Sequence, residues 1–333
     1  MSKDKVKELE ELVERTLEFT VSEREARKVA ESIEEKIRKT YEPILEPSKP
    51  VRSPELMVKI LKEKYKLITD YRVVALTVAA FINGRPVLYE GPPGTGKTEI
   101  GEAILTLWAG KRAFVLPCSE NYDEYRVIGD FHPLMALKYG FSEDSYIPRP
   151  LLAALVLDVG VLVDEIRRSS EEFQNMLLDI VDKRRIIVPE LRRVFKSKGI
   201  GFQVIMTSNP EDIAQGELSD AFLRRVVRIK FTYPPREVEA EIIRLRTENI
   251  DVEIPPEYLS KMLDVVERLR EQAIHKPGPA DTILWAQLAK SIAKLKNKKR
   301  IGIQELKETA LVSLVKRIED EELVEKITNE ILG

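Results

Sequence analysis

The sequence has little cysteine, little net charge and no long apolar run, and each shortage excludes a class of protein. Cys118 is the only cysteine among 333 residues, so no internal disulfide can form and a reducing compartment is expected. The 54 basic and 56 acidic side chains leave a net charge of −2, which gives no reason to expect a polyanionic partner. The most apolar stretch, residues 73–82, is too short for a membrane helix. The charged beginning, MSKDKVKELEE, does not resemble a signal peptide, so we expect a cytoplasmic protein.

Two amphipathic helices are predicted within residues 3–40. Their apolar residues recur at helical spacing in two stripes, Val6, Leu9, Val13 and Leu17, then Ala26, Val29, Ile33 and Ile37. Ser22 and Glu25 have the spacing of a capping box and predict where the second helix begins. Prolines at positions 43, 47, 50 and 54 then predict an extended connector. The stripes can pack on the body of the protein or bind a partner, and packing is the simpler interpretation.

Helical segments alternate with short apolar runs from about residue 55 to residue 232. The strand candidates are 86–90, 113–117, 160–163, 202–207 and 226–231. This alternation favours a parallel sheet covered by helices on both faces. Beyond residue 233 the β character disappears, and helices are predicted over 235–247, 256–271, 280–296, 303–317 and 320–331. We therefore predict an N-terminal helical extension (1–50), an α/β core (51–232) and an all-helical domain (233–333).

The strongest motif, G-x-x-x-x-G-K-T, directly follows the first predicted strand and opens a helix. Its residues are Gly91, Pro92, Pro93, Gly94, Thr95, Gly96, Lys97 and Thr98. Glycine lets backbone N–H groups approach a phosphate, Lys97 places an ammonium on the β and γ oxygens, and Thr98 can ligate Mg²⁺. The positive end of the helix dipole points at the same anion. The chain has only 15 glycines, so the clustering of three here disfavours a chance turn and predicts a nucleoside triphosphate site.

Another predicted strand ends in two adjacent carboxylates, Asp164 and Glu165. Neighbouring side chains of a strand point to opposite faces, so the two can take different roles. We assign Asp164 to Mg²⁺ and Glu165 to the attacking water, which it can orient and deprotonate. As a structural alternative, the pair only marks the turn that leaves the strand. Its position downstream of a phosphate loop favours the catalytic interpretation.

Polar residues after the next strand and helix are further candidates. Asn209 directly follows the run VIMTS and can place its amide beside the γ-phosphate and the attacking water, although Asn-Pro turns also occur for ordinary reasons. Arg224 and Arg225 can neutralise charge on a transferred phosphoryl group, or act as dipole partners at a helix C-terminus. Arg167 and Arg168 follow the two carboxylates and fit either an intersubunit contact or a solvated turn.

The ordered motifs GPPGTGKT, VGVLVDEIRR, VIMTSNP and AFLRRVV resemble those of AAA+ ATPases over about residues 55–325. Two further segments, YRVIGDFHP through YIPRPLL and DKRRIIVPEL, are similar to hairpins inserted in the MoxR-type branch. The MoxR-like pattern IP-x-PLL…DEI-x-R is matched from Ile147 and from Asp164. The resemblance implies an α/β AAA+ P-loop NTPase core, with a parallel sheet sandwiched by helices. It also implies an α-helical C-terminal lid after that core and an N-terminal helical extension before it.

The resemblance assigns roles to the residues within one subunit. Residues 91–98 would be Walker A, Asp164 and Glu165 would be Walker B, and Asn209 would be sensor 1. The activity implied is hydrolysis of ATP to ADP and phosphate with Mg²⁺, with Thr98 and Asp164 as the metal-binding residues.

Other roles involve a second subunit or a partner. Arg225, with Arg224 as neighbour or substitute, would be the arginine finger that enters the adjacent subunit's site. A finger that acts in trans implies a ring-forming homo-oligomer, usually a hexamer. MoxR-like proteins typically work with a von Willebrand A-domain partner on a protein client, so both are expected here.

The chain departs from the family pattern at sensor 2. Many relatives carry an arginine at the start of a lid helix, but residues 276–285, KPGPADTILW, contain none. His275 or Lys276 could substitute, and a surface loop is the simpler interpretation. The family's glutamate-switch residue would lie near Ser119 or Asn121.

Three functions follow from these features. A remodelling or chaperone-type ATPase that acts on protein clients or complex assembly is favoured. The alternative is a nucleic-acid motor or loader, such as a restriction-system subunit. Balanced charge and the lack of interleaved aromatic and basic residues weigh against it, and the basic run 294–300 fits a solvated helix end. A nucleotide-gated scaffold that hydrolyses too slowly for work is disfavoured by the complete set of catalytic candidates.

Overall fold

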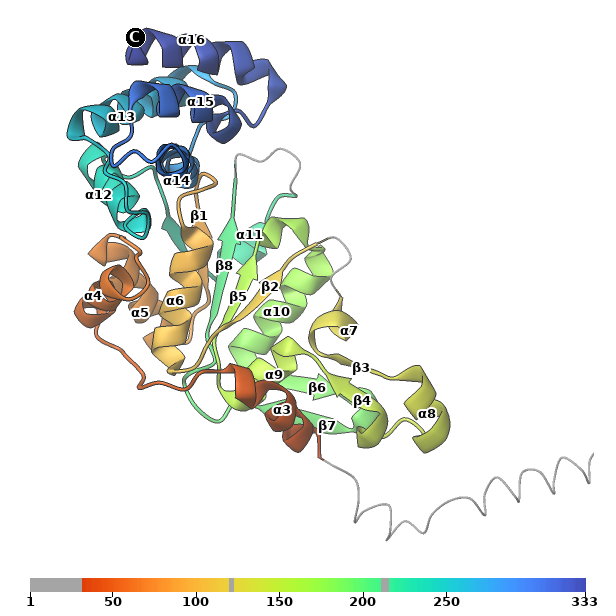
Figure 1. The fold of residues 1–333 in the computed structure, drawn as a ribbon. Helices are drawn as coiled ribbons and strands as arrows, with labels where there is room; N and C mark the ends of the chain where they lie inside the picture. Colours follow the sequence, from red (N-terminus) through yellow and green to blue (C-terminus); the bar gives the residue numbers. More distant parts are fainter. Residues whose placement is uncertain (1–31, 120–122, 211–215) are drawn as a thin grey trace, which may run out of the picture.

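The computed structural model describes residues 32–119, 123–210 and 216–333. The predicted first helix and the predicted Ser22–Glu25 capping box lie outside these residues. The chain forms an α/β core and a separate group of helices at its C-terminal end (Figure 1). Among the described residues, no helix has the length and apolar character needed to cross a membrane.

A five-stranded parallel sheet forms the centre of the core. Its order is β2 (Phe114–Pro117), β5 (Val161–Asp164), β8 (Val204–Ser208), β1 (Val87–Glu90) and β9 (Val227–Lys230). These are the five predicted strands, with ends that differ by a residue or so from the sequence-based bounds, and the predicted parallel sheet is confirmed. Because the strands are parallel, their carboxyl ends lie on the same side of the sheet, where ligands of open α/β folds bind. The last residues of β1, β5 and β8 there are Glu90, Asp164 and Ser208.

Helices cover both faces of the sheet because the strands are apolar on both sides. Val87 and Tyr89 pack on one face with α4 (Pro54–Glu63), α5 (Tyr71–Ile82) and α6 (Lys97–Ala109). Leu88, Val161 and Val163 pack on the other with α3 (Ile33–Tyr41), α9 (Pro150–Leu157) and α10 (Glu171–Lys183). The alternation along each strand therefore divides the core into two layers, as Figure 1 shows.

Helix α3 belongs to the core. Ser32 is its N-cap and forms a reciprocal capping box with Glu35. Ile33 and Ile37, two residues of the predicted second stripe, are fully buried against the core, so this part of the stripe packs on the body as expected. A 3₁₀ turn (Glu42–Ile44) and an extended segment then lead to α4.

Two antiparallel hairpins extend from the core where the insertions were expected. The first pairs β3 (Gly129–Phe131) with β4 (Tyr146–Pro148), and it carries α8 (Pro133–Tyr139) and a 3₁₀ turn (Glu143–Ser145) between the strands. The short helix α7 (Glu124–Val127) precedes it. The second pairs β6 (Arg185–Val188) with β7 (Arg193–Lys196) through a 3₁₀ turn (Pro189–Leu191).

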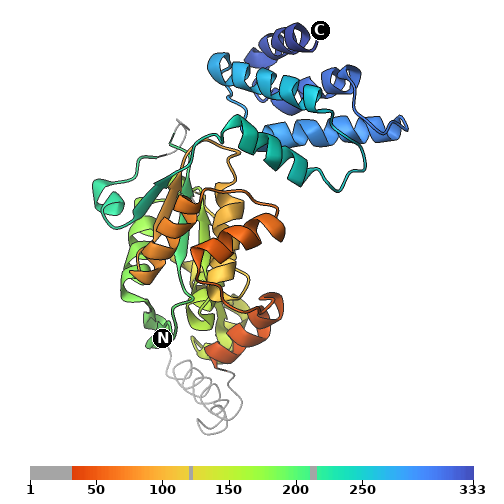
Figure 2. The ribbon, with the colours of Figure 1, turned by 90° about the vertical axis from the view of Figure 1, so that its left-hand side faces the viewer.

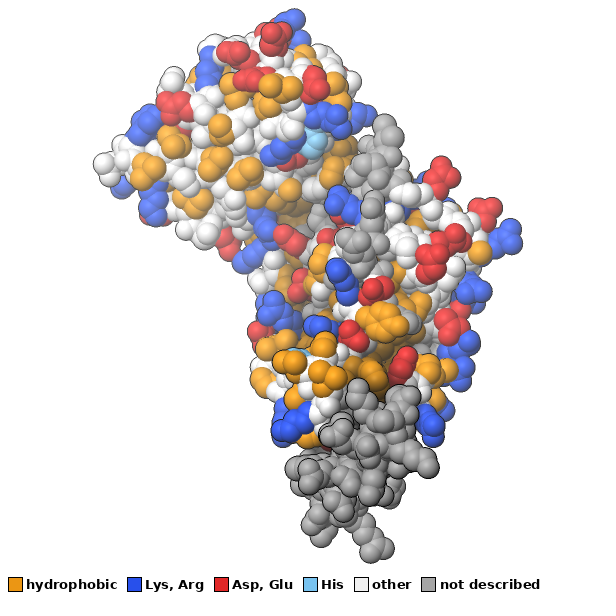
Figure 3. Space-filling view, turned by 90° about the vertical axis from the view of Figure 1, so that its right-hand side faces the viewer, with side chains coloured by type: hydrophobic (Ala, Val, Ile, Leu, Met, Phe, Trp, Pro, Cys, Tyr) orange, Lys and Arg blue, Asp and Glu red, His pale blue; other side chains and the backbone are white. Residues whose placement is uncertain are grey.

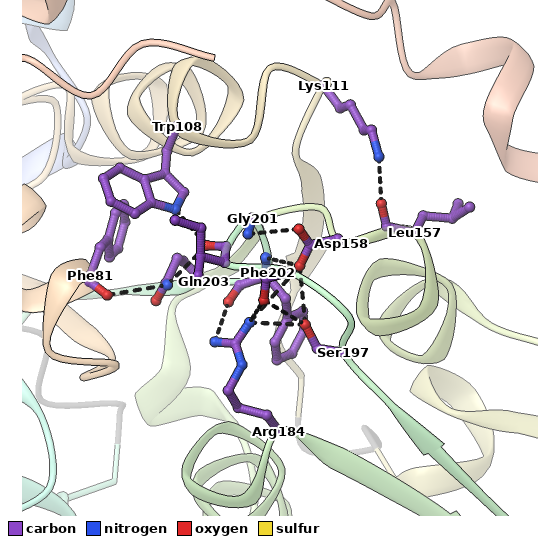
Figure 4. A network of polar contacts seen from close by, with 12 residues as sticks. Phe81, Trp108, Lys111, Leu157, Asp158, Arg184, Ser197, Gly201, Phe202 and Gln203 are labelled. Carbon is purple, nitrogen blue, oxygen red and sulfur yellow. Dashed lines mark hydrogen bonds and ion pairs between the residues drawn. The ribbon is translucent and has the colours of Figure 1, made fainter.

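A polar cluster lies at the amino-terminal ends of the sheet strands, opposite the end that carries Glu90, Asp164 and Ser208 (Figure 4). Asp158, in the left-handed conformation at φ 56°, accepts hydrogen bonds from the Gly201 and Phe202 amides and from Ser197 Oγ at 2.9, 3.0 and 3.0 Å. Arg184 donates to the Phe202 and Gly199 carbonyls at 3.0 and 2.6 Å. The cluster fixes the loop that leads from β7 into β8.

The C-terminal helices, which correspond to the predicted lid, have their own apolar core, which includes the fully buried Trp285. They are α12 (Arg236–Arg246), α13 (Pro256–Gln272), α14 (Pro279–Leu295), α15 (Ile303–Leu314) and α16 (Glu321–Leu332). These match the five predicted helices. The lid stands beyond the carboxyl-terminal strand ends (Figures 1 and 2). Arg246 reaches Glu99 of α6 with two bonds, at 2.9 and 3.1 Å.

Candidate functional site

The G-x-x-x-x-G-K-T loop connects β1 to the start of α6, as the motif requires. Gly94 and Gly96 adopt left-handed conformations at φ 71° and 83°, which favour glycine over residues with a side chain. Gly91 meets another restriction, because a Cβ there would lie 2.3 Å from the Phe231 carbonyl oxygen. Thr95 Oγ1 donates to the Pro92 carbonyl at 2.9 Å and braces the turn. The loop is therefore shaped by its own glycines and Thr95 and by the neighbouring Phe231.

Lys97 lies inside this loop and is 8% exposed. Its ammonium donates to the carbonyl oxygens of Gly91 and Pro92 at 2.9 and 2.7 Å. Burial lowers the pKa of Lys97 to about 8, and the negative charges of Asp164 and Glu165 partly oppose this shift. The two carbonyl oxygens stabilise the ammonium only through their partial negative charges. An anion bound in the loop would stabilise it with a full negative charge.

Asp164 and Thr98 meet beneath the loop. Thr98 Oγ1 donates to Asp164 Oδ1 at 2.8 Å, although the two residues come from different parts of the chain. Two hard oxygen ligands at this separation suit Mg²⁺, which usually takes one or two protein ligands and completes its octahedron with phosphate and water. Among the described residues, no cluster of three or more acidic, histidine or cysteine side chains forms an all-protein metal cage.

Thr207 is a site residue that the sequence analysis missed. Its hydroxyl donates to Asp164 Oδ1 at 2.5 Å and accepts from the Glu165 amide at 3.0 Å. This one hydroxyl therefore orients the predicted metal ligand and the backbone of the predicted base. The signal in the sequence was a threonine two positions before Asn209 on the neighbouring strand.

Glu165 is separated from Asp164 by a turn, and the strand-alternation argument does not apply to it. Strand β5 ends at Asp164, and Glu165 adopts the left-handed conformation at φ 55° before a 3₁₀ turn (Ile166–Arg168). Its carboxylate pairs with Arg168 Nε at 2.6 Å, and both side chains remain partly exposed. The two carboxylates therefore differ in environment because the backbone turns sharply between them.

A second group missed by the sequence analysis surrounds Glu90, the residue before the loop. Its carboxylate is only 4% exposed and lies 2.7 Å from Arg228 Nε and 3.5 Å from Arg167 Nη2. Arg167 also donates from Nε to Ser208 Oγ at 2.6 Å. Arg167 is thus bound within its own subunit, which disfavours the intersubunit contact considered above.

The remaining candidates do not all lie at these strand ends: Asn209 does, whereas Arg224 and Arg225 precede the amino-terminal end of β9. Asn209 directly follows β8 and is half-buried. Arg224 and Arg225 follow the short helix α11 (Asp220–Leu223) and are exposed. Of the two glutamate-switch positions, Ser119 follows β2, whereas Asn121 lies outside the described residues.

The lid contacts the phosphate loop at the start of α14. The Ala280 amide donates to the Gly94 carbonyl at 3.1 Å, and a Cβ on Gly278 would lie 2.6 Å from the Pro93 carbonyl oxygen. The lid helix that lacks a sensor-2 arginine therefore reaches the loop with its backbone. His275 is directed elsewhere: its Nε2 lies 3.5 Å from Asp281, and its amide donates to Asp320 at 2.8 Å.

Residues 86–226 match the family model of the AAA domain (dynein-related subfamily). This match covers the β1 strand, the phosphate loop, both carboxylates and the two arginines after α11. The fold of the chain is that of AAA+ P-loop ATPases, with a parallel five-stranded sheet between helices and a helical C-terminal part.

Relatives with curated names share part of the chain. An uncharacterized protein of Escherichia coli, YehL, is 25% identical over 164 residues, which cover 48% of this chain and 45% of that protein. The gas vesicle ATPase GvpN of Ancylobacter aquaticus is 24% identical over 214 residues, which cover 60% of this chain and 58% of GvpN. The chain thus matches about half the length of each. The crystal structure of a protein from Cytophaga hutchinsonii is 18% identical, with a TM-score of 0.43, and the match covers 84% of this chain and 94% of that one.

Proposed function

We propose that this chain binds and hydrolyses ATP with Mg²⁺ and converts hydrolysis into work on a protein client, as a member of the MoxR-type branch of AAA+ ATPases. The observation that carries the proposal is the hydrogen-bonded series from Thr98 through Asp164 and Thr207 to Glu165. It joins the phosphate loop to the predicted metal ligand and to the predicted base. The name of the relative GvpN, a gas vesicle ATPase, supports the same activity.

Each residue of the series has a distinct role in the proposed reaction. Bound Mg²⁺ would supply positive charge to the phosphate oxygens, held by Thr98 and by Asp164 directly or through its water shell. Lys97 would move its donated bonds from the loop carbonyls to the β- and γ-phosphates. Thr207 keeps Asp164 oriented, and Asn209 would hold the attacking water beside the γ-phosphate.

Glu165 is the proposed general base. To accept a proton from the attacking water at its carboxylate, it must exchange its contact with Arg168 for that water. Both partners are partly exposed, so their 2.6 Å ion pair contributes little free energy and can be broken at small cost. Arg168 would then hold the base aside until nucleotide and water are in place.

The exposed Arg225, with Arg224 beside it, would complete the site of an adjacent subunit. Guanidinium groups that act in trans stabilise charge on the transferred phosphoryl group. We therefore propose a ring, with a hexamer as the expected size, in which each active site is shared between neighbours.

The β3–β4 insertion is the proposed client surface. Helix α8 has no buried residue, and Leu134, Leu137 and Phe141 are 71%, 85% and 76% exposed. Figure 3 shows hydrophobic side chains gathered on the lower part of the core, on the side from which this insertion extends in Figure 1. Exposed apolar groups of this kind mark protein contacts. A von Willebrand A-domain partner and a cytoplasmic location complete the proposal.

The basic run 294–300 supports a protein client over nucleic acid. Lys296 pairs with Glu305 and Glu308 at 3.2 and 2.8 Å, and Lys298 also reaches Glu305 at 2.8 Å. Arg300 pairs with Glu253 at 2.6 Å. These charges are neutralised within the lid, so a phosphate backbone would have to compete with existing carboxylates.

Replacing the base tests the proposal. Glu165→Gln should bind ATP with an affinity within about threefold of the parent while its turnover falls by roughly 10²–10⁴-fold, because general-base catalysis is lost. ATP affinity is measured by calorimetry and turnover by phosphate release. Glu172→Gln, an equal charge change on the exposed first turn of α10, is the matched control and should be unchanged. Normal turnover in Glu165→Gln would falsify the base assignment.

A further inference from the structure

We propose that Arg167 is a positioning residue that fixes the segment carrying the arginine finger relative to the nucleotide site of its own subunit. The inference rests on the proposed ring and on its trans-acting finger. The family resemblance assigns no role to this position: in the pattern DEI-x-R, Arg167 occupies the variable place and Arg168 the fixed one.

Arg167 connects three parts of the chain that are distant in sequence. Its Nε donates to Ser208 Oγ at 2.6 Å, its Nη1 to the Gly216 carbonyl at 3.3 Å, and its Nη2 lies 3.5 Å from Glu90. The Arg167 carbonyl in turn accepts from the Gly216 amide at 3.2 Å. A side chain only 15% exposed, with every nitrogen directed to a different element, is held in one geometry.

Neutralising Glu90 does not explain this arrangement. Glu90 is buried and needs a counter-charge, but Arg228 already approaches it to 2.7 Å. Arg167 is farther from the carboxylate and makes its shortest bond to Ser208 instead. Two of its three donor nitrogens thus reach a hydroxyl and a backbone carbonyl, and orienting these neutral groups requires the planar fork of a guanidinium rather than a point charge.

Gly216 is the weakly held end of this connection. Ser208 is the last residue of β8, is 1% exposed and is fixed by pairing with β1, where the Gly91 amide also donates to its carbonyl at 3.3 Å. Gly216 is exposed and precedes α11, the helix that ends at Arg224 and Arg225. Losing the Arg167 side chain should therefore loosen Gly216, and through it the segment that reaches the finger past the buried Leu218 and Phe222, while β8 keeps its place.

The consequence is a defect that falls on the neighbouring subunit. A ring of Arg167→Gln subunits would retain complete nucleotide loops and carboxylates but would present misplaced fingers. We expect ATP affinity within about threefold of the parent and turnover reduced at least tenfold. Arg167→Lys should not restore turnover, because lysine replaces the charge but not the fork.

Mixed rings test this assignment. Lys97→Ala subunits, with a dead site but an intact finger, are mixed with Arg167→Gln subunits, and phosphate release is compared with that of each variant alone. Restored turnover in the mixture is expected, since Arg167→Gln sites would then receive intact fingers. No restoration would place the defect in the subunit's own site and overturn the inference. Arg112→Gln, at an exposed arginine remote from these contacts, is the control and should keep full turnover.

A second mixture distinguishes failure of the ring proposal from failure of the Arg167 assignment. Lys97→Ala with Arg225→Ala must restore turnover if fingers act in trans, and its failure rejects the shared site itself. If Arg167→Gln does not fold, Ser208→Ala removes the 2.6 Å acceptor but keeps Arg167 beside Glu90. It should show the same defect, smaller in size and rescued by Lys97→Ala subunits. Unchanged turnover in Ser208→Ala would also reject the role of Arg167.

Discussion

The two ends of the central sheet each hold an aspartate bonded to hydroxyl groups, but the two sites differ in what remains for a ligand. At one end, Asp158 receives two backbone amides and the Ser197 hydroxyl, and the cluster is complete without any added group (Figure 4). At the other end, Asp164 Oδ1 receives the Thr98 and Thr207 hydroxyls. Both hydroxyls donate to the same oxygen, so the second oxygen of Asp164 could accept a metal or its water, as no donor to it is found among the described residues.

This difference predicts that Asp158 contributes to stability and Asp164 to the proposed activity. Amide donors at Asp158 belong to the backbone of a loop, so the carboxylate determines how that loop folds. Gly199 and Gly201 show the same dependence, because a Cβ on either would lie within 2.3 Å of an Asp158 atom. Hydroxyl donors at Asp164 are side chains that can rotate toward a ligand without moving the backbone. The first end is fixed by folding, and the second can change its partners.

The largest effect expected is the loss of turnover in Asp164→Asn. Asparagine keeps an oxygen for the two hydroxyls but removes the charge that would hold Mg²⁺, so turnover should fall by about 100-fold or more. The thermal midpoint should stay close to that of the parent. Phosphate release across a Mg²⁺ titration and a thermal melt give the two readouts.

Asp179→Asn is the matched control for this change, since Asp179 is an exposed carboxylate on α10 paired with Lys183. It should leave turnover unaltered. A large loss of stability in Asp164→Asn, with turnover intact, would show that the two ends of the sheet do not differ as described.

The second effect is expected at the opposite end, and it has the reverse signature. Asp158→Asn tolerates the left-handed backbone but turns an acceptor oxygen into a donor facing amides and Arg184, so unfolding should be easier by roughly 1–3 kcal/mol. ATP affinity should be unchanged. Urea denaturation followed by circular dichroism, with Asp179→Asn as control, measures the first quantity and calorimetry the second. Weakened ATP binding at unchanged stability would contradict the comparison.

The elements of the fold could be predicted from the sequence because each depends on a local pattern. Five apolar runs between helices gave the strands, and the glycine-rich motif placed Lys97 and Thr98 at the start of a helix. The start of helix α3 was not predicted. Ser32–Glu35 has the same spacing as Ser22–Glu25 and caps this helix, whereas Ser22–Glu25 lies outside the described residues.

The contacts that complete the site could not be predicted, because they depend on the strand order. Thr207 reaches Asp164 only because β8 lies beside β5, and Arg167 reaches Glu90 and Ser208 only because β1 lies beside β8. The left-handed turn at Glu165 also has no signature in a non-glycine residue. Sequence therefore identified the candidate groups for nucleotide binding, whereas the groups that orient them required the tertiary structure.

The smallest effect expected concerns pH and the only buried cation of the phosphate loop, Lys97. Its pKa, lowered to about 8 by burial, means that the free loop loses this charge as pH rises above 8. Bound phosphate favours the ammonium, so ATP binding must then take up a proton, and affinity should fall by up to tenfold per pH unit above about 8. Calorimetric titrations of ATP at about pH 7.5, 8.5 and 9.5 measure how the affinity changes with pH.

Stability should respond to the same group in the opposite direction. Between pH 8 and its ordinary pKa of 10.5, Lys97 binds more protons in the unfolded chain than in the folded one. Its contribution to the unfolding free energy without nucleotide therefore rises with pH across this window.

Lys97→Arg is the control for the ATP titrations, because arginine stays charged throughout, so the ATP affinity of this variant should change little with pH over the range. If the parent bound ATP equally well at pH 7.5 and 9.5, Lys97 would stay protonated in the free loop as it does in the bound loop. The carbonyl partners of Lys97 would then satisfy its charge without a ligand, as the partners of Asp158 do.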